Sequence, residues 1–258
     1  MVRAKKHLGQ HFLRDLDIAQ RIVDSLSASQ KRVLELGPGT GVLTQYLVKR
    51  KDIDLKLVEL DIESVDYLKA HYFELEGRIF FKDFLKIDLK EFFTEPFALI
   101  GNFPYNISGP IFFRVFEYRN QIPEVVGMLQ KEVAERLAAG PGSKTYGVLS
   151  VLLQAFFNIE YLFTVDEHVF DPPPKVKSGV IRLVRNDVES LGCDEKLFVK
   201  VVKAIFNQRR KAIRNSLKAI EFNKEAISDH DYLTRRPEQM SVQDFIELTK
   251  MVEANPIR

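Results

Sequence analysis

A glycine-rich turn directly after a short apolar segment is the feature that most limits the fold of this chain. The apolar segment is Arg32–Leu36 (RVLEL), the turn is Gly37-Pro38-Gly39-Thr40-Gly41, and residues 42–50 then follow a helical pattern. Glycines at such a turn let the backbone bend sharply and let a ligand lie against the main chain. Open α/β sheets bind their ligands at this kind of position, outside the carboxyl end of a strand.

Strand-like and helix-like segments alternate through the first two thirds of the sequence. Short buried strands that alternate with helices predict a parallel sheet covered on both faces, and therefore an α/β fold class. After the first strand and helix, strands are expected at residues 55–59, 79–81, 98–101 and 125–129, and a helix at 62–72. Two further segments, at residues 158–165 and 180–184, flank the proline-rich segment Asp171–Pro174 and predict an antiparallel addition.

The character of the sequence changes near Asn186. From Asp194 onward no segment has the pattern of a strand, and helices are expected at residues 195–207, 210–219, 224–229 and 242–255. Ser241 is the expected N-cap of the last helix, with Asp244 in its first turn. We therefore predict two domains, an α/β domain at residues 1–186 and a small all-helical domain at residues 187–258.

The composition limits the environment of the protein. A chain of 258 residues can bury most of its surface without a disulfide or a metal. The single cysteine, Cys193, excludes an intramolecular disulfide and a cysteine-rich zinc site. No apolar run approaches the ~20 residues that cross a bilayer, and residues 1–13 lack the apolar core of a signal peptide. We expect a soluble cytoplasmic protein with no metal and no membrane partner.

The charge is unevenly distributed, although the formal net charge is only +2. Residues 1–14 and residues 196–218 contain basic side chains and no acidic one. Separate basic blocks in a nearly neutral chain are typical of a protein that binds a polyanion locally. The alternative is that these charges are solvated helix faces.

The spacing of the glycines favours a nucleoside ligand without a pyrophosphate. A dinucleotide fingerprint needs a third glycine at position 42, which is Val42, and the Gly-Lys-Ser/Thr of a triphosphate loop is absent. Glu59 ends the second strand and can accept hydrogen bonds from ribose hydroxyls, and Asp83 follows the third strand and can accept one from an adenine amine. We therefore predict S-adenosylmethionine as the cofactor. The alternative is an ordinary turn with solvated acids.

The tetrapeptide Asn102-Phe103-Pro104-Tyr105 follows the fourth strand and suits methyl transfer to an adenine amine. That amine is a poor nucleophile because its lone pair is delocalised into the ring. The Asn102 side-chain oxygen and the Phe103 carbonyl can accept its hydrogens and localise the lone pair, and Tyr105 can stack on the base. Phe170, on the rigid loop that contains Pro172-Pro173-Pro174, is a candidate for the opposite face of the base.

Several motifs in the same order resemble the ribosomal RNA adenine dimethyltransferase family, in its bacterial small-subunit branch. The resemblance runs nearly end to end. It rests on Lys5–Leu13, Glu35–Gly41, Val58–Asp61, Asn102–Ser108, Phe170–Ser178, Phe206–Lys211 and Arg236–Ser241. Two positions depart from the common pattern: His11 stands where asparagine is common, and Phe103 where leucine is common.

The resemblance implies a seven-stranded, Rossmann-like class I methyltransferase sheet and a helical C-terminal RNA-binding domain. We expect the protein to be a monomer. It implies dimethylation of two adjacent adenines in the 3′-terminal hairpin loop of 16S rRNA, in immature small ribosomal subunits late in assembly. The implied catalytic residues are Asn102, Tyr105 and Phe170. The implied cofactor-binding residues are Gln10, His11, Leu13, Gly37, Gly39, Glu59, Asp83 and Asn102. The expected RNA-binding residues are Lys175, Arg209, Arg210 and Lys211.

Three other functions remain open at this point. The nearest is the related methyltransferase that modifies an adenine of 23S rRNA. The second is an assembly factor that binds rRNA without catalysis, because phosphate contacts need no chemistry. The third is an NAD-dependent oxidoreductase, which the glycine spacing disfavours.

Overall fold

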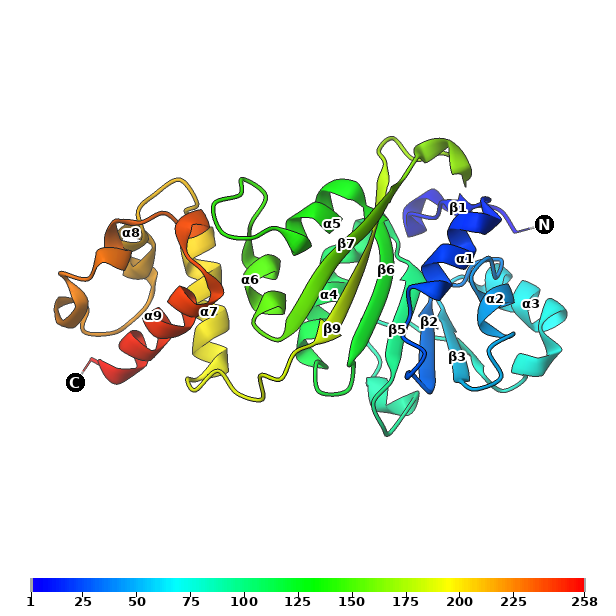
Figure 1. The fold of residues 1–258 in the computed structure, drawn as a ribbon, viewed down its shortest axis with the longest axis horizontal. Helices are drawn as coiled ribbons and strands as arrows, with labels where there is room; N and C mark the ends of the chain where they lie inside the picture. Colours follow the sequence, from blue (N-terminus) through cyan, green and yellow to red (C-terminus); the bar gives the residue numbers. More distant parts are fainter. Residues whose placement is uncertain (1, 258) are drawn as a thin grey trace. The chain divides into compact units, whose positions relative to one another are not determined.

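The computed structural model describes residues 2–257, which form two compact units (Figure 1). The first unit contains residues 2–135 and Ile159–Arg185, and the second contains Arg136–Asn158 and residues 186–257. Residues 136–158 thus pack with the C-terminal helices, although the sequence pattern placed them in the first domain. The predicted domain boundary at residue 186 stays a prediction, because a compact packing unit is not by itself an independently folding domain.

A seven-stranded mixed sheet organises the first unit, in the order β4-β3-β2-β5-β6-β9-β7. Pairing is parallel from β4 to β6, and β9 is antiparallel to β6. This arrangement confirms the predicted α/β fold and the antiparallel addition. The strands are β2 (Arg32–Leu36), β3 (Asp54–Glu59), β4 (Ile79–Phe81), β5 (Ala98–Asn102), β6 (Glu124–Gln130), β7 (Phe157–Val165) and β9 (Ser178–Arg185).

The register of the parallel strands brings their carboxyl ends level. Leu36 of β2 lies opposite Val58 of β3, and Glu59 of β3 lies opposite Phe81 of β4. The residues that follow these strands therefore meet at one edge of the sheet. Val33, Leu34 and Leu36 are all buried, as is expected of a strand in the middle of a covered parallel sheet.

Two helices of the first unit, α1 and α3, begin at aspartate caps. Asp15 accepts a hydrogen bond from the Ile18 backbone N–H (3.0 Å) and begins α1, and Asp61 begins α3. α1 packs against β6, and α3 packs against β3 and β4. The helices are α1 (Leu16–Asp24), α2 (Thr44–Leu47), α3 (Ile62–His71), α4 (Ser108–Glu117) and α5 (Lys131–Ala138), and the last three residues of α5 belong to the second unit. The prediction of a helix over residues 42–50 was too long, because turns precede and follow α2.

Short 3-10 helices and a second, two-stranded sheet complete this unit. β1 (Phe12–Leu13) pairs antiparallel with β8 (Phe170–Asp171), and Leu13 lies opposite Phe170. The 3-10 helices are η1 (Lys6–Leu8), η2 (Phe73–Leu75), η3 (Leu89–Glu91), η4 (Tyr105–Ile107) and η5 (Glu167–Val169).

The second unit is helical, as expected from the sequence of its C-terminal part. Its core is formed by the apolar face of α7 (Glu195–Phe206), which packs against α6 (Val148–Gln154), α8 (Ile213–Ser216) and α9 (Val242–Ala254). Ser241 and Asp244 form the predicted cap of α9, since each side chain accepts a hydrogen bond from the other residue's backbone N–H.

The remaining elements of the second unit are 3-10 turns rather than α-helices. They are η6 (Leu217–Ala219), η7 (Lys224–Ile227), η8 (Asp231–Thr234) and η9 (Pro237–Gln239). The helices expected at residues 210–219 and 224–229 are shorter than predicted: the first is α8 followed by η6, and the second is the 3-10 helix η7. Nowhere in residues 2–257 does a helix combine the length and the apolarity that a membrane span would need.

Candidate active site

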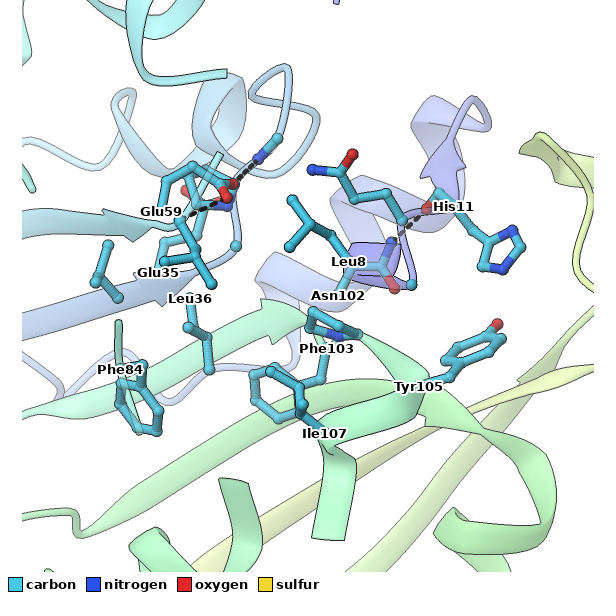
Figure 2. Close-up of a pocket in the computed structure, with 18 of the residues that line it drawn as sticks. Leu8, His11, Glu35, Leu36, Glu59, Phe84, Asn102, Phe103, Tyr105 and Ile107 are labelled. Atoms are coloured by element: carbon cyan, nitrogen blue, oxygen red, sulfur yellow. Dashed lines mark hydrogen bonds between the residues drawn. The ribbon is translucent and has the colours of Figure 1, made fainter. Parts of the chain in front are cut away.

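A cavity of about 290 Å³ lies at the carboxyl ends of β2, β3, β4 and β5 (Figure 2). Every residue that the sequence assigned to the cofactor lines this cavity, and Tyr105 lines it too. The cofactor candidates that the fold brings together here are Gln10, His11, Leu13, Gly37, Gly39, Glu59, Asp83 and Asn102. Phe170 is not among the described residues that line the cavity.

The glycine turn and Glu59 are joined by hydrogen bonds. Glu59 is 7% exposed, and its carboxylate accepts hydrogen bonds from the backbone N–H groups of Gly39 (3.0 Å), Leu60 (2.8 Å) and Asp61 (2.9 Å). A carboxylate has about four lone-pair positions, so one is left for a ligand hydroxyl. Burial raises the pKa of Glu59, against the opposing effect of these hydrogen bonds.

Positive backbone φ angles explain the first two glycines of the turn. φ is +66° at Gly37 and +58° at Gly39, a region that other residues rarely adopt. A Cβ at Gly39 would also lie 2.9 Å from the Phe12 ring of the N-terminal segment. The turn can therefore pass close to a ligand and to the segment that covers it.

Glu35 is a buried acid in the cavity wall that sequence reasoning identified only as part of the glycine motif. It is 1% exposed and accepts a hydrogen bond of 2.7 Å from the Thr44 hydroxyl. Burial raises the pKa of Glu35 to about 8, and the nearby Glu59 carboxylate acts in the same direction. Glu35 therefore keeps its proton near neutral pH.

The N-terminal segment, residues 5–13, contributes residues 7–13 to the cavity wall and is held in place by polar contacts. Asp61 forms a salt bridge with Lys5 and accepts a hydrogen bond from the Gln10 amide (3.3 Å). The Gln10 side-chain oxygen also accepts from the Lys5 backbone N–H (2.8 Å). Burial acts to raise the pKa of Asp61, but the hydrogen bonds from Lys5, Ser64 and Gln10 outweigh it and hold this pKa below its ordinary value. Sequence reasoning missed Lys5 and Asp61 as site residues, because their contact spans more than fifty positions.

Asn102 ends β5 at the cavity. Its side-chain NH₂ donates a hydrogen bond of 3.0 Å to the backbone carbonyl of His11. Because a carbonyl can only accept, this bond fixes the orientation of the amide. The Asn102 Oδ1 has no hydrogen-bond donor among the described residues, and it remains an available acceptor.

Phe103, at the position where leucine is common, lines the cavity and has a buried ring. The ring is 1% exposed and packs edge-on against Phe112. A Cβ at Gly101 or Gly127 would lie within 3.0 Å of it. The phenylalanine therefore fills a space that two strand glycines leave open, while its backbone follows Asn102 along the cavity wall.

Two aromatic side chains lie beside each other at one end of the cavity (Figure 2). The His11 and Tyr105 ring centroids are 5.4 Å apart, with an interplanar angle of 30°. His11 Nδ1 lies 2.7 Å from the Pro172 carbonyl, and the Tyr105 hydroxyl lies 2.5 Å from the Ser178 hydroxyl. Phe170 is 4% exposed and belongs to the hydrophobic core cluster that contains Leu13.

The predicted RNA-binding residues lie in both units. In the first, Lys175 is exposed on the segment after β8. In the second, Arg210 and Lys211 are exposed, whereas Arg209 is half-buried and donates a hydrogen bond of 3.2 Å to the Ser143 carbonyl. No cluster of three or more metal-ligating side chains occurs in residues 2–257.

Comparison with known proteins assigns the family. Residues 1–252 match the family model described as ribosomal RNA adenine dimethylase. The chain is 61% identical to ribosomal RNA small subunit methyltransferase A of Cytophaga hutchinsonii, over 97% of this chain and 98% of that protein. It is 60% identical to the protein of the same name from Parabacteroides distasonis, over 96% and 94% of the two chains.

Solved structures support the same fold. A dimethyladenosine transferase from Plasmodium falciparum has a TM-score of 0.77 at 23% identity, over 92% of this chain and 96% of that one. The 23S rRNA methyltransferase ErmE has a TM-score of 0.66 at 26% identity, over 93% and 99% of the two chains. With its whole-length family match and its close relatives, the chain belongs to the ribosomal RNA adenine dimethylase family.

Proposed function

We propose that this protein transfers methyl groups from S-adenosylmethionine to the exocyclic amines of two adjacent adenines in the 3′-terminal hairpin loop of 16S rRNA. The substrate in this proposal is the immature small ribosomal subunit, in the cytoplasm, and the enzyme acts as a monomer. The observation that carries the proposal is the orientation of Asn102, whose Oδ1 is an available acceptor at a cavity lined by all the expected cofactor residues.

The residues around the cavity fit S-adenosylmethionine. Glu59 has one lone-pair position left, which is proposed for a ribose hydroxyl, and Asp83, which lines the cavity, is proposed to accept a hydrogen bond from the adenine amine. The turn at Gly37 and Gly39 offers a surface without side chains for the methionine part. When bound, the cofactor supplies an electrophilic methyl group on a sulfonium.

Asn102 and Phe103 activate the target amine in this proposal. The Asn102 Oδ1 and the Phe103 backbone carbonyl accept hydrogen bonds from the amine and draw its lone pair out of conjugation with the ring. The side-chain NH₂ of Asn102 is already committed to the His11 carbonyl. The acceptor is therefore placed before the base arrives, which lowers the cost of orienting it.

His11 has no role as a general base in this proposal, because the reaction needs none, although its contact with Pro172 leaves Nε2 as the acceptor nitrogen of the neutral ring. A backbone carbonyl cannot donate, so His11 Nδ1 carries the hydrogen in its 2.7 Å contact with Pro172. Neutral acceptors suffice for the reaction, since the amine can lose its proton after transfer.

The target base is gripped by aromatic side chains in this proposal. Tyr105 lines the cavity and stacks on the flipped adenine. Phe170 is proposed as the opposite face. Since only 4% of Phe170 is exposed, contact with a base requires its ring to turn out of the core cluster. Lys175, Arg209, Arg210 and Lys211 are proposed to contact RNA phosphates, with Arg210 and Lys211 the more exposed of the C-terminal group.

The experiment is incorporation of labelled methyl groups into immature 30S particles, followed by mapping of the modified nucleotides. Protein-free 23S rRNA is the parallel substrate, because ErmE shares this fold. Labelling of two adjacent adenines near the 3′ end of 16S rRNA is expected. Labelling of 23S rRNA alone, or of neither substrate, would refute the proposal.

A further inference from the structure

The buried hydroxyl of Ser178 is bonded to the hydroxyl of Tyr105 at 2.5 Å. Ser178 is fully buried, and Tyr105 is partly buried at the cavity. We infer that Ser178 is a positioning residue, which holds the Tyr105 ring in the plane needed to stack on the target adenine. This inference rests on the stacking role proposed above for Tyr105.

The Ser178 end of this contact is rigid. Ser178 begins β9, where it lies opposite Gln130 of β6, and the Lys131 backbone N–H donates to the Lys177 carbonyl (2.9 Å) next to it. The following residue, Gly179, has no room for a side chain, because a Cβ there would lie 2.8 Å from both Ala134 and Tyr161. The Ser178 hydroxyl is thus fixed to the central sheet.

The Tyr105 end has few other restraints. Tyr105 begins η4, a 3-10 helix of three residues directly after Pro104. Its ring has one aromatic neighbour within the described chain, His11, at 5.4 Å between centroids. A hydrogen bond at the far end of a tyrosine side chain limits rotation about both side-chain bonds, so the Ser178 contact determines where the ring points.

The same segment also fixes the neighbouring ring. The Pro172 carbonyl accepts from His11 Nδ1, and Ser178 lies six positions later. Residues 172–178 therefore contact both rings, His11 through the Pro172 carbonyl and Tyr105 through the Ser178 hydroxyl. In the sequence Ser178 is only the last residue of the motif Phe170–Ser178, and nothing there indicates its contact with Tyr105.

The test is a double-mutant cycle with Ser178→Ala, Tyr105→Phe and the double variant. Tyr105→Phe keeps the ring and removes only its hydroxyl. Each single variant is expected to lower kcat for methyl transfer about tenfold, because small misplacement of a reacting group is costly. The double variant is expected to lose no more than either one, since both changes remove the same contact. The dissociation constant for S-adenosylmethionine is expected to stay within about twofold.

Ser150→Ala is the matched control. Ser150 is also fully buried, its hydroxyl donates to the Arg136 carbonyl, and neither residue is among those that line the cavity. This variant should lower the melting temperature without changing kcat. A wild-type kcat for Ser178→Ala, or losses that multiply in the double variant, would overturn the inference. If Ser178→Ala does not fold, Tyr105→Phe alone tests the inference. A wild-type kcat for Tyr105→Phe then overturns it.

Tyr105→Ala separates this inference from the proposed function. If Tyr105→Ala transfers methyl groups at the wild-type rate, the stacking role itself fails. If Tyr105→Ala is impaired while Tyr105→Phe and Ser178→Ala are not, stacking stands and the positioning role of Ser178 fails.

Discussion

The side-chain NH₂ of Asn102 donates a hydrogen bond of 3.0 Å to the backbone carbonyl of His11. This bond joins the end of β5 to the N-terminal segment and also sets the direction of the Asn102 Oδ1. The two ends of one amide thus have different roles: the NH₂ holds the N-terminal segment, and Oδ1 is the acceptor proposed for the target amine. Substitutions at Asn102 should therefore affect chemistry more than RNA binding.

Asn102→Ala is expected to reduce methyl transfer by about a hundredfold or more, because loss of a preorganised hydrogen-bond group at a reacting centre costs this much. RNA affinity should change by less than about threefold. Asn102→Asp should be equally inactive, since a carboxylate cannot donate to the His11 carbonyl. Single-turnover transfer and filter binding measure the two quantities.

Asn158→Ala is the control for this change, since Asn158 is an exposed asparagine on β7. It should transfer at the wild-type rate. If Asn102→Ala retained that rate as well, the acceptor mechanism would be wrong.

Lys5→Ala is expected to weaken binding of S-adenosylmethionine about fivefold, mainly through faster release. The Asp61 side chain is fully buried, and its salt bridge with Lys5 fastens the N-terminal segment at the cavity. Removal of the cation leaves a buried carboxylate with less compensation. Isothermal titration measures the affinity, and the exposed neighbour Lys6 provides the control Lys6→Ala. Equal affinities for the two variants would show that the salt bridge does not retain the cofactor.

Much of the sheet could be predicted because its strands are local and strongly apolar. The predicted bounds of β2 and β4 are those observed, and Glu59, Asp83 and Asn102 were placed by the rule that parallel strands share a carboxyl edge. The cap of α9, formed by Ser241 and Asp244, could likewise be predicted, since these two residues are only three positions apart.

The parts that could not be predicted depend on contacts between distant segments. β1 and β8 have two residues each, and each exists only because the other pairs with it. Lys5 and Asp61, or Tyr105 and Ser178, show no periodicity that would link them in the sequence. The helix predicted at residues 42–50 is shorter in the structure, because the turns of the glycine-rich segment continue to the start of α2.

Arg210→Ala and Lys211→Ala are expected to weaken RNA binding and to flatten its salt dependence. Both side chains are exposed, and removal of one phosphate contact should reduce the slope of log K against log salt by about 0.7 to 0.9. Arg209→Ala should also lower the melting temperature, because Arg209 donates to the Ser143 carbonyl. Binding measured from low to high salt checks the slopes, with Lys69→Ala on α3 as an exposed control. If neither variant changes the slope of log K against log salt, Arg210 and Lys211 are solvated side chains that do not contact RNA phosphates.

Glu35→Gln is expected to flatten the pH dependence of stability. Burial raises the pKa of Glu35 to about 8 from the ordinary value of 4.5. Between these values the folded protein keeps a proton that the unfolded chain has lost, so this group makes the free energy of unfolding fall as pH rises. The slope from one such group is at most about 1.4 kcal/mol per pH unit. Glutamine stays neutral and can still accept from Thr44, so this contribution should disappear.

Denaturant unfolding of wild type and Glu35→Gln between pH 5 and pH 8.5 measures the effect. The free energy of unfolding of the variant, minus that of wild type, should increase with pH across the range and level off above about pH 8. Glu74→Gln changes an exposed glutamate in η2, and its free energy of unfolding should have the same pH dependence as that of wild type. A difference that stays constant with pH would mean that Glu35 is already ionised in the folded protein. The cavity would then hold two charged carboxylates, Glu35 and Glu59, in its wall.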